Sequence, residues 1–101
     1  MKRTEPQSLR AVLEEAVREC DMEQELLRTR AQALWPRIVG KEIASRCGRP
    51  FCRADIMTIP VQNASLRHEL SMMRSSMIKA INTTLRADVI SEIRFVGLNN
   101  R

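Results

Sequence analysis

The tryptophan–proline pair Trp35-Pro36 constrains the fold of this chain more than any other feature of its sequence. It contains the only tryptophan and interrupts a stretch whose apolar residues follow a helical spacing. Proline lacks a backbone N–H but is tolerated at the first position of a helix. The pair therefore predicts that one helix breaks near Trp35, that another runs from Pro36 to about Arg46, and that the indole anchors the joint. Gly40 falls inside the second helix, where close packing of another backbone would explain it.

The residues before this pair also predict helices. Apolar residues stand at positions 9, 12, 13, 16 and 17, so residues 8–20 are expected to form an amphipathic helix with Ser8 as its N-cap. Asp21 is predicted to open a further helix, because Glu23 and Glu25 then lie in its first turn, where the helix dipole favours carboxylates. The apolar face continues from there to the Trp35-Pro36 pair.

After Gly48 and Pro50 the apolar period changes from that of a helix to that of a strand. Residues 51–53 and 56–61 are predicted to be two strands, and the short turn between them makes them antiparallel neighbours. Pro60 cannot donate a ladder hydrogen bond, so the second strand is expected at a sheet edge or to be irregular at that point.

The helical period returns after Asn63 in the clearest amphipathic pattern of the chain. Its apolar positions are Leu66, Leu70, Met73, Met77, Ile81 and Leu85. Ser75-Ser76 is a candidate point of division into two helices, and residues 89–96 predict a third strand. We expect one α+β domain over residues 1–101, with its core in about 8–96, in which helices cover one face of a small three-stranded sheet. Each element has only one apolar side, which favours this arrangement.

The charge is distributed unevenly along the chain. Residues 1–25 contain four basic and seven acidic residues, a net −3, whereas the remainder contains thirteen basic and five acidic residues, a net +8. The second part would attract a polyanion or an acidic protein surface, and a basic surface without a dedicated partner is the alternative. The chain has no apolar run long enough to span a membrane and no secretory signal near Met1, so we expect a cytoplasmic protein.

The sequence offers little catalytic or metal-binding chemistry. Cys20, Cys47 and Cys52 show no C-x-x-C spacing and His68 is the only histidine, which predicts reduced thiols and no metal site. His68 and its neighbour Glu69 point about 100° apart on a helix, which does not suit acid–base catalysis. The S-x-x-K pattern of residues 76–79 lacks the partner motifs of serine acyl enzymes. We therefore expect a protein that is not an enzyme and that uses no cofactor or small-molecule substrate.

Recognition of a polyanion is the remaining chemistry, and it depends on two groups of basic residues. One group surrounds the helix-to-strand turn and the other lies on the polar side of the long helical run. The candidate nucleic-acid contacts are Arg46, Arg49 and Arg53 in the first group and Arg67, Arg74 and Lys79 in the second. If both share one edge of the domain, they form a surface that follows phosphates with little sequence preference. No aromatic stacking partner is expected, because Tyr is absent and both Phe residues lie in strand patterns.

Four blocks of sequence occur in order along the chain, at residues 35–44 (W-x-x-I-V-G), 57–70 (ending in H-E-L), 78–82 (I-N) and 89–95 (I-R-F). Together they resemble the DciA family, bacterial proteins that operate or load the DnaB-type replicative helicase. The resemblance implies a K-homology-like domain, with N-terminal helices followed by strand, strand, helix, helix and strand, that binds single-stranded or forked DNA and the helicase. Within the first block, Trp35, Arg37 and Lys41 are the candidate helicase contacts, although burial in the core is favoured for a large aromatic such as Trp35.

Two functions remain open from the sequence. The first is a non-enzymatic accessory protein of DNA replication that binds DNA and the helicase. The second is a protein–protein interaction module whose basic surface has no role in binding nucleic acid.

Overall fold

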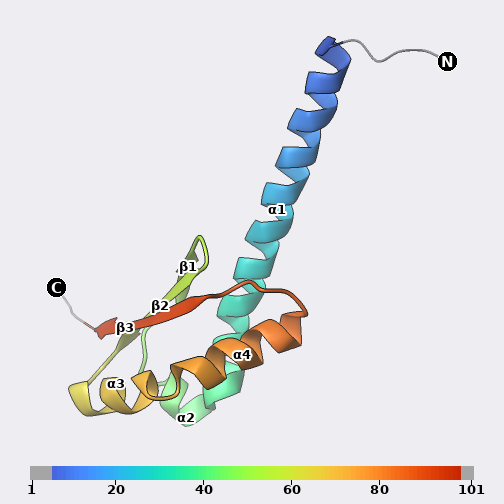
Figure 1. Ribbon diagram of the computed structural model, residues 1–101. Coiled ribbons are helices and arrows are strands. Elements are labelled where there is room, and N and C mark those ends of the chain that lie inside the picture. Colours follow the sequence, from blue (N-terminus) through green and yellow to red (C-terminus); the bar gives the residue numbers. More distant parts are fainter. Residues whose placement is uncertain (1–5, 99–101) are drawn as a thin grey trace.

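The computed structural model describes residues 6–98, which form the α+β fold expected from the sequence (Figure 1). The elements in chain order are α1 (Pro6–Val39), α2 (Lys41–Ala44), β1 (Phe51–Arg53), β2 (Ile56–Val61), α3 (Ala64–Ser71), α4 (Arg74–Leu85) and β3 (Glu92–Gly97). After the N-terminal helices the order is strand, strand, helix, helix, strand, as the K-homology-like arrangement requires.

Helix α1 is continuous, so the predicted breaks at Asp21 and near Trp35 are wrong. Pro36 lies inside the helix, where it removes the hydrogen bond to the carbonyl of Gln32. The neighbouring indole of Trp35 is only 1% exposed, so the core packing of α1 extends up to the proline. The helical bonding resumes after it, since the amide of Gly40 donates to the carbonyl of Pro36 at 3.0 Å.

The chain leaves the helix at Gly40 instead. Gly40 has a φ of 95°, a left-handed conformation that strains residues with a side chain. No atom lies within 4 Å of the position that a Cβ would take there, so the expectation of a closely packed backbone at Gly40 is wrong. Glycine is needed for its backbone conformation, and α2 then follows as a single short turn that ends at Ala44 rather than near Arg46.

Strand β2 is the centre of the sheet, whose order is β1-β2-β3. It pairs antiparallel with β1 and parallel with β3, so that Met57 lies between Cys52 and Ile93. The predicted antiparallel pair of strands is confirmed, and Ala54 closes their turn with a φ of 56°.

Pro60 therefore lies in the central strand, and the prediction of an edge position is wrong. Its carbonyl accepts a hydrogen bond of 2.7 Å from the amide of Gly48, and the N–H and C=O of one strand residue point to the same side. A backbone N–H at position 60 would therefore point toward the isolated bridge between Cys47 and Val61, beyond the residues that pair in the β1–β2 ladder. The missing N–H of Pro60 thus removes no hydrogen bond from that ladder.

The long helical run divides into α3 and α4 at Met72-Met73 rather than at Ser75-Ser76. Asn63 caps α3, because its Oδ1 accepts from the amide of Leu66 at 2.8 Å. The third strand begins at Glu92, three residues later than the predicted start of 89.

Residues 89 and 90 belong to a buried loop that Asn82 of α4 holds in place. Its Oδ1 accepts from the amides of Val89 and Ile90, both at 3.0 Å, and its Nδ2 donates to the carbonyl of Ile90 at 2.8 Å. The apolar pair at 89–90 is therefore part of the core without being part of the strand.

The core lies between the sheet and the helices. Met57, Ile59 and Val61 of β2 are fully buried, and α3, α4 and the C-terminal part of α1 lie on their side of the sheet (Figure 1). Trp35 packs against Phe95 of β3, with ring centroids 5.9 Å apart. The alternate residues of β2 point to the opposite face, which no helix within residues 6–98 covers, so the predicted coverage of one face is confirmed.

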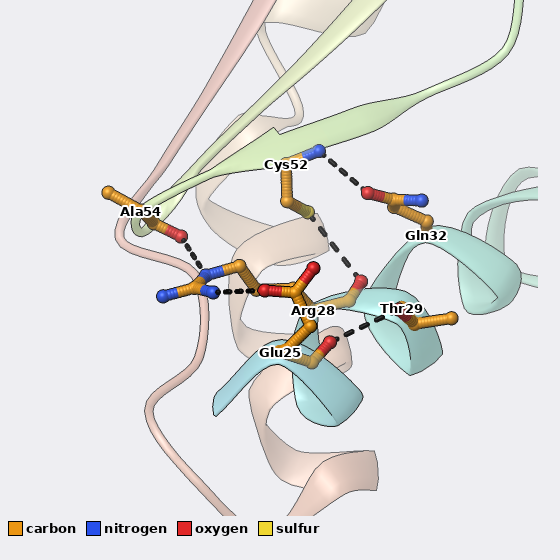
Figure 2. Close-up of polar contacts among 6 residues, drawn as sticks. All are labelled: Glu25, Arg28, Thr29, Gln32, Cys52 and Ala54. Atoms are coloured by element: carbon orange, nitrogen blue, oxygen red, sulfur yellow. Dashed lines mark hydrogen bonds and ion pairs between the residues drawn. The ribbon is translucent and has the colours of Figure 1, made fainter. Parts of the chain in front are cut away.

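The N-terminal part of α1 projects away from this core (Figure 1). Every residue from Ser8 to Leu26 is exposed, and we call this segment the arm. Figure 2 shows how its base is attached: Nε of Arg28 donates to the carbonyl of Ala54 at 2.8 Å, and Oε1 of Gln32 accepts from the amide of Cys52 at 2.8 Å. These bonds fix α1 to the β1–β2 hairpin and satisfy a backbone donor of the edge strand β1.

Candidate functional site

Arg67 and Arg74 converge on one surface hollow although they belong to different helices. The hollow has a volume of ≈ 260 Å³ and is lined by Ala64, Arg67, His68, Ser71, Arg74 and Phe95. None of these lining residues is acidic, and within residues 6–98 neither arginine takes part in an ion pair. Arg67 is oriented by a hydrogen bond of 3.5 Å from its Nη1 to the carbonyl of Val61. Two guanidinium groups around one hollow are suited to binding an anion such as a phosphate.

The structure brings Arg46 near this hollow. The carbonyl of Arg46 accepts from the amide of Gln62 at 3.1 Å, which places its backbone beside the end of β2 to which Arg67 is also bonded. Arg49 follows Gly48, and Gly48 lies against Pro60 and Leu98. Both arginines are exposed.

The structure does not bring Arg53 and Lys79 to the same place. Arg53 pairs with Ile56 at the opposite end of β2 from Val61, roughly 17 Å away at the rise of a strand. Lys79 is exposed on α4, whose Met77 and Ile81 face the core. Of the six candidate residues, Arg67 and Arg74 line the hollow, the backbone of Arg46 lies beside the same end of β2, and Arg49, Arg53 and Lys79 do not line the hollow.

An exposed aromatic side chain was missed in the sequence. Phe51 is 51% exposed on the open face of the sheet, the face opposite the buried residues of β2. On this face Phe51 pairs with Thr58 of β2, which in turn pairs with Arg94 of β3. Cys52 packs against the core, so its strand neighbours Phe51 and Arg53 must point outward. This alternation was the signal in the sequence from which a stacking partner could have been expected.

A second, apolar groove of ≈ 280 Å³ lies between α1–α2 and the α3–α4 pair. It is lined by Ile38, Val39, Ile43, Leu70, Met73, Ser76, Met77 and Ala80. Met72 and Met73, at the junction of α3 and α4, are 74% and 52% exposed. Such methionine-rich apolar surfaces adapt well to a partner protein.

The candidate partner contacts differ in their exposure. Arg37 and Lys41 are exposed on the α1–α2 segment that also contributes to the apolar groove. Trp35 is buried in the core, so the structure corrects the assignment of Trp35 as a direct partner contact. Its fully packed indole has no surface to offer to another protein and acts as a core anchor.

The cysteines lie apart from one another and are all free thiols. Burial raises the pKa of Cys47, and it raises the pKa of Cys52 to about 11 although the charge of Arg28 opposes the shift. Both thiols are therefore protonated and unreactive near neutral pH. Between residues 6 and 98 no cluster of His, Cys, Asp and Glu side chains is placed to hold a metal ion. In the same part of the chain, the helices lack the length and apolar character needed to cross a membrane.

Comparison with known protein families identifies the family of this chain. The family model described as "Dna[CI] antecedent, DciA" matches residues 8–95. The chain belongs to the DciA family. This family is associated with loading of the DnaB helicase in replication. A search of curated proteins finds no match to the chain.

The DciA-like sequence blocks occupy mainly structural positions. Trp35 and Phe95 pack together, Ile81 and Ile93 are fully buried, and Asn82 holds the loop before β3. These residues specify the DciA fold rather than a binding surface. The exposed arginines and the methionines that line the two surface features lie mostly between the blocks, so the binding functions must be argued from their positions.

Proposed function

We propose that this DciA-family chain is a cytoplasmic, non-enzymatic accessory protein of bacterial DNA replication that binds DNA and a DnaB-type replicative helicase. The observation that carries the DNA-binding part is the hollow shared by Arg67 and Arg74, with Arg46 beside it and no carboxylate in its lining. The phosphates of single-stranded or forked DNA fit this arrangement, which supplies positive charge but makes no base-specific contacts.

The open face of the sheet extends the proposed DNA surface. Phe51 offers an aromatic ring on which a base stacks, and Arg53 and Arg94 lie on the same face. Arg49 is exposed on the segment that leads into β1, whereas Lys79 on α4 contacts only a longer DNA. Binding through these groups is weak and shows little sequence preference.

Reversal of charge at the hollow tests the DNA-binding part. We expect Arg67→Glu combined with Arg74→Glu to weaken binding of fluorescent single-stranded DNA at least about tenfold at low salt. The slope of log affinity against log salt should fall by about 1.4, because two phosphate contacts are lost at about 0.7 each. The measurement is a fluorescence anisotropy titration of single-stranded and forked DNA at several salt concentrations.

The matched control reverses two arginines elsewhere. Arg18→Glu combined with Arg30→Glu changes the net charge equally on the exposed surface of α1, and it should leave most of the affinity intact. An equal loss in both double variants would show that net charge alone, and not the hollow, determines binding. Absence of wild-type binding even at low salt would remove DNA from the proposed function.

For the helicase we propose the apolar groove between α1–α2 and α3–α4, with Arg37 and Lys41 at its side. An amphipathic helix of the helicase laid in this groove would contact Met73 of its lining, with the exposed Met72 next to it in the chain, and place its acidic residues against the two cations. Large apolar side chains exposed together beside basic residues support this assignment.

A pull-down with purified helicase after nuclease treatment tests this contact. We expect retention of the wild-type chain and at least a tenfold loss with Met73→Glu or with Arg37→Glu plus Lys41→Glu. Met73 lines the groove and is 52% exposed, so its substitution should leave the fold intact, which circular dichroism can verify. Full retention of both variants would exclude this groove as the helicase contact.

The alternative function, a protein-interaction module without a nucleic-acid role, uses the same arginines. It is favoured if the wild-type chain does not bind DNA while Arg67→Glu plus Arg74→Glu abolishes retention by the nuclease-treated helicase. The observation in its favour is that guanidinium groups bind carboxylates as well as phosphates.

A further inference from the structure

The arm of α1 carries an apolar stripe that nothing in the described part of the chain covers. Leu9, Val12, Leu13 and Val17 are 51–61% exposed, and Ala16 and Cys20 complete the stripe on the same side of the helix. Further along α1 the same side of the helix continues into Leu27, Ala31 and Trp35, which pack on the core. The stripe is thus the uncovered continuation of a face that is buried elsewhere.

The arm has little reason to be helical on its own. Within residues 8–98, Leu27 is the first residue of α1 that packs on the core, and most helical stability in proteins comes from packing of an apolar face, which the arm lacks. An apolar stripe of this kind is typical of a helix that packs against another helix. Contact with a partner would supply the burial that the arm lacks.

The spacing of the stripe is self-complementary. The intervals between positions 9, 12, 13, 16, 17 and 20 are 3, 1, 3, 1 and 3, which are the same in both directions along the chain. Two antiparallel copies centred between Glu14 and Glu15 therefore match apolar with apolar residues throughout. The facing pairs are Leu9 with Cys20, Val12 with Val17 and Leu13 with Ala16. A two-fold dimer requires this property, because the same surface serves both partners.

Most of the charged residues are compatible with this pairing. At about 100° per residue, Glu14, Glu15 and Glu25 point away from the stripe, whereas Glu23 lies on the stripe side of the helix but beyond the paired positions 9–20. Arg10 and Asp21 lie along the same edge of the stripe. In the antiparallel pairing Arg10 of one copy faces position 19 of the other copy, which is two residues from Asp21. The symmetry forms this oppositely charged pair twice, although each arm has a net charge of −4 from two basic and six acidic residues between positions 8 and 26.

The bodies of the two domains do not collide in this arrangement. The first packed residue, Leu27, is roughly 19 Å along the helix from the centre of the pairing, so the two domains lie at opposite ends of the paired arms. The bonds of Arg28 and Gln32 to the β1–β2 hairpin hold each arm in its projecting direction (Figure 2).

We propose that the arm is a dimerisation element, in which the apolar stripes of two copies of this chain pack antiparallel. Each copy contributes six side chains, whereas stable interfaces use about 20–30 residues a side, so the dimer is weak, with a dissociation constant of roughly 10–100 µM. Because the arms repel each other, added salt strengthens the dimer, whereas it weakens binding to DNA.

Sedimentation of the whole chain from about 5 to 500 µM, at about 50 and 500 mM NaCl, tests the proposal. We expect a shift from monomer to dimer that salt promotes. Leu13→Glu should raise the dissociation constant at least about tenfold, because it places a charge in the contact. Ala11→Glu is the matched control, since it adds the same charge on the opposite side of the arm and should leave the dimer unchanged or only slightly weaker. Circular dichroism verifies that both variants remain helical.

Cross-linking tests the antiparallel register. Leu9→Cys places a thiol opposite Cys20 of the other copy, so mild oxidation by diamide should yield a covalent dimer that additional Cys20→Ser abolishes. Ala11→Cys should not cross-link, because this side chain points away from the contact. A wild-type dimer linked directly through its two Cys20 residues would overturn the antiparallel register.

Two further results would overturn the proposal. One is a chain that stays monomeric over the whole concentration range. The other is a loss of helicase retention with Leu13→Glu while wild-type chain and variant both remain monomeric, which would assign the stripe to the helicase. Neither result depends on whether the hollow of Arg67 and Arg74 binds DNA, so the dimer and the proposed function are tested separately.

Discussion

Replacing Trp35 with alanine is expected to lower the free energy of unfolding by about 3–5 kcal/mol, the range for truncating a large buried aromatic side chain. Trp35 is 1% exposed and packs on Phe95 at a centroid distance of 5.9 Å, so its removal leaves a cavity between α1 and β3. Small domains have only about 5–15 kcal/mol of stability, and such a loss leaves much less of the chain folded. Urea denaturation followed by circular dichroism measures the change.

Trp35→Phe provides the informative comparison. The phenyl ring keeps part of the apolar contact and removes the indole N–H, which is buried without an acceptor within residues 6–98. An unpaired buried donor costs about 1–3 kcal/mol, so this variant should lose much less stability than the alanine variant. Val12→Ala on the exposed arm is the control and should change stability by less than about 0.5 kcal/mol at low protein concentration. A loss below about 1 kcal/mol for Trp35→Ala would contradict its role as the core anchor.

The Trp35-Pro36 pair also shows why local sequence did not predict the course of α1. The proline was correctly identified as a helix-breaking residue, but its cost is limited to bonds near the end of the helix. The burial of Trp35 depends on contacts with β3, which lies far along the chain, and local patterns contain no information on it. Gly40 was visible in the sequence, but only the structure shows that its positive φ, rather than its small size, is what the fold requires.

The sheet and the site also combine features set by the local sequence, which were predicted, with features set by contacts between distant segments, which were not. Alternation within residues 56–61 predicted the strand and its buried side correctly, because this pattern is local. The central position of β2 depends on parallel pairing with β3 after two intervening helices, which is why the place of Pro60 was predicted wrongly. Arg67 and Arg74 are seven residues apart, a spacing that places two side chains on the same side of a helix, so the sequence could group them. Phe95 of β3, which completes the lining of their hollow, comes from a distant strand that local patterns could not place beside them.

The loop before β3 should depend on Asn82 more strongly than on any other polar side chain. We expect Asn82→Ala to lower the free energy of unfolding by about 2–4 kcal/mol, because the buried Ile90 loses both the acceptor of its amide N–H and the donor to its carbonyl, while the amide of Val89 keeps only the carbonyl of Ala87. Asn82→Asp keeps an acceptor oxygen for the two amides but places a carboxylate oxygen against the carbonyl of Ile90, so it should also be destabilising. Urea denaturation gives both values.

Thr83→Ala, at the next position of α4, is the control for Asn82 because its side chain is exposed, and it should change stability by less than about 0.5 kcal/mol. Hydrogen exchange separates a local from a global effect. If Asn82 fixes the entry to β3, its alanine variant should lose protection first at the amides of Val89 and Ile90, then along the pairing of β3 with β2. Unchanged protection at these two amides would show that the loop is held by the burial of its apolar side chains alone. Asn82 would then contribute little to the attachment of β3, and a different polar side chain of the domain would have the largest effect on stability.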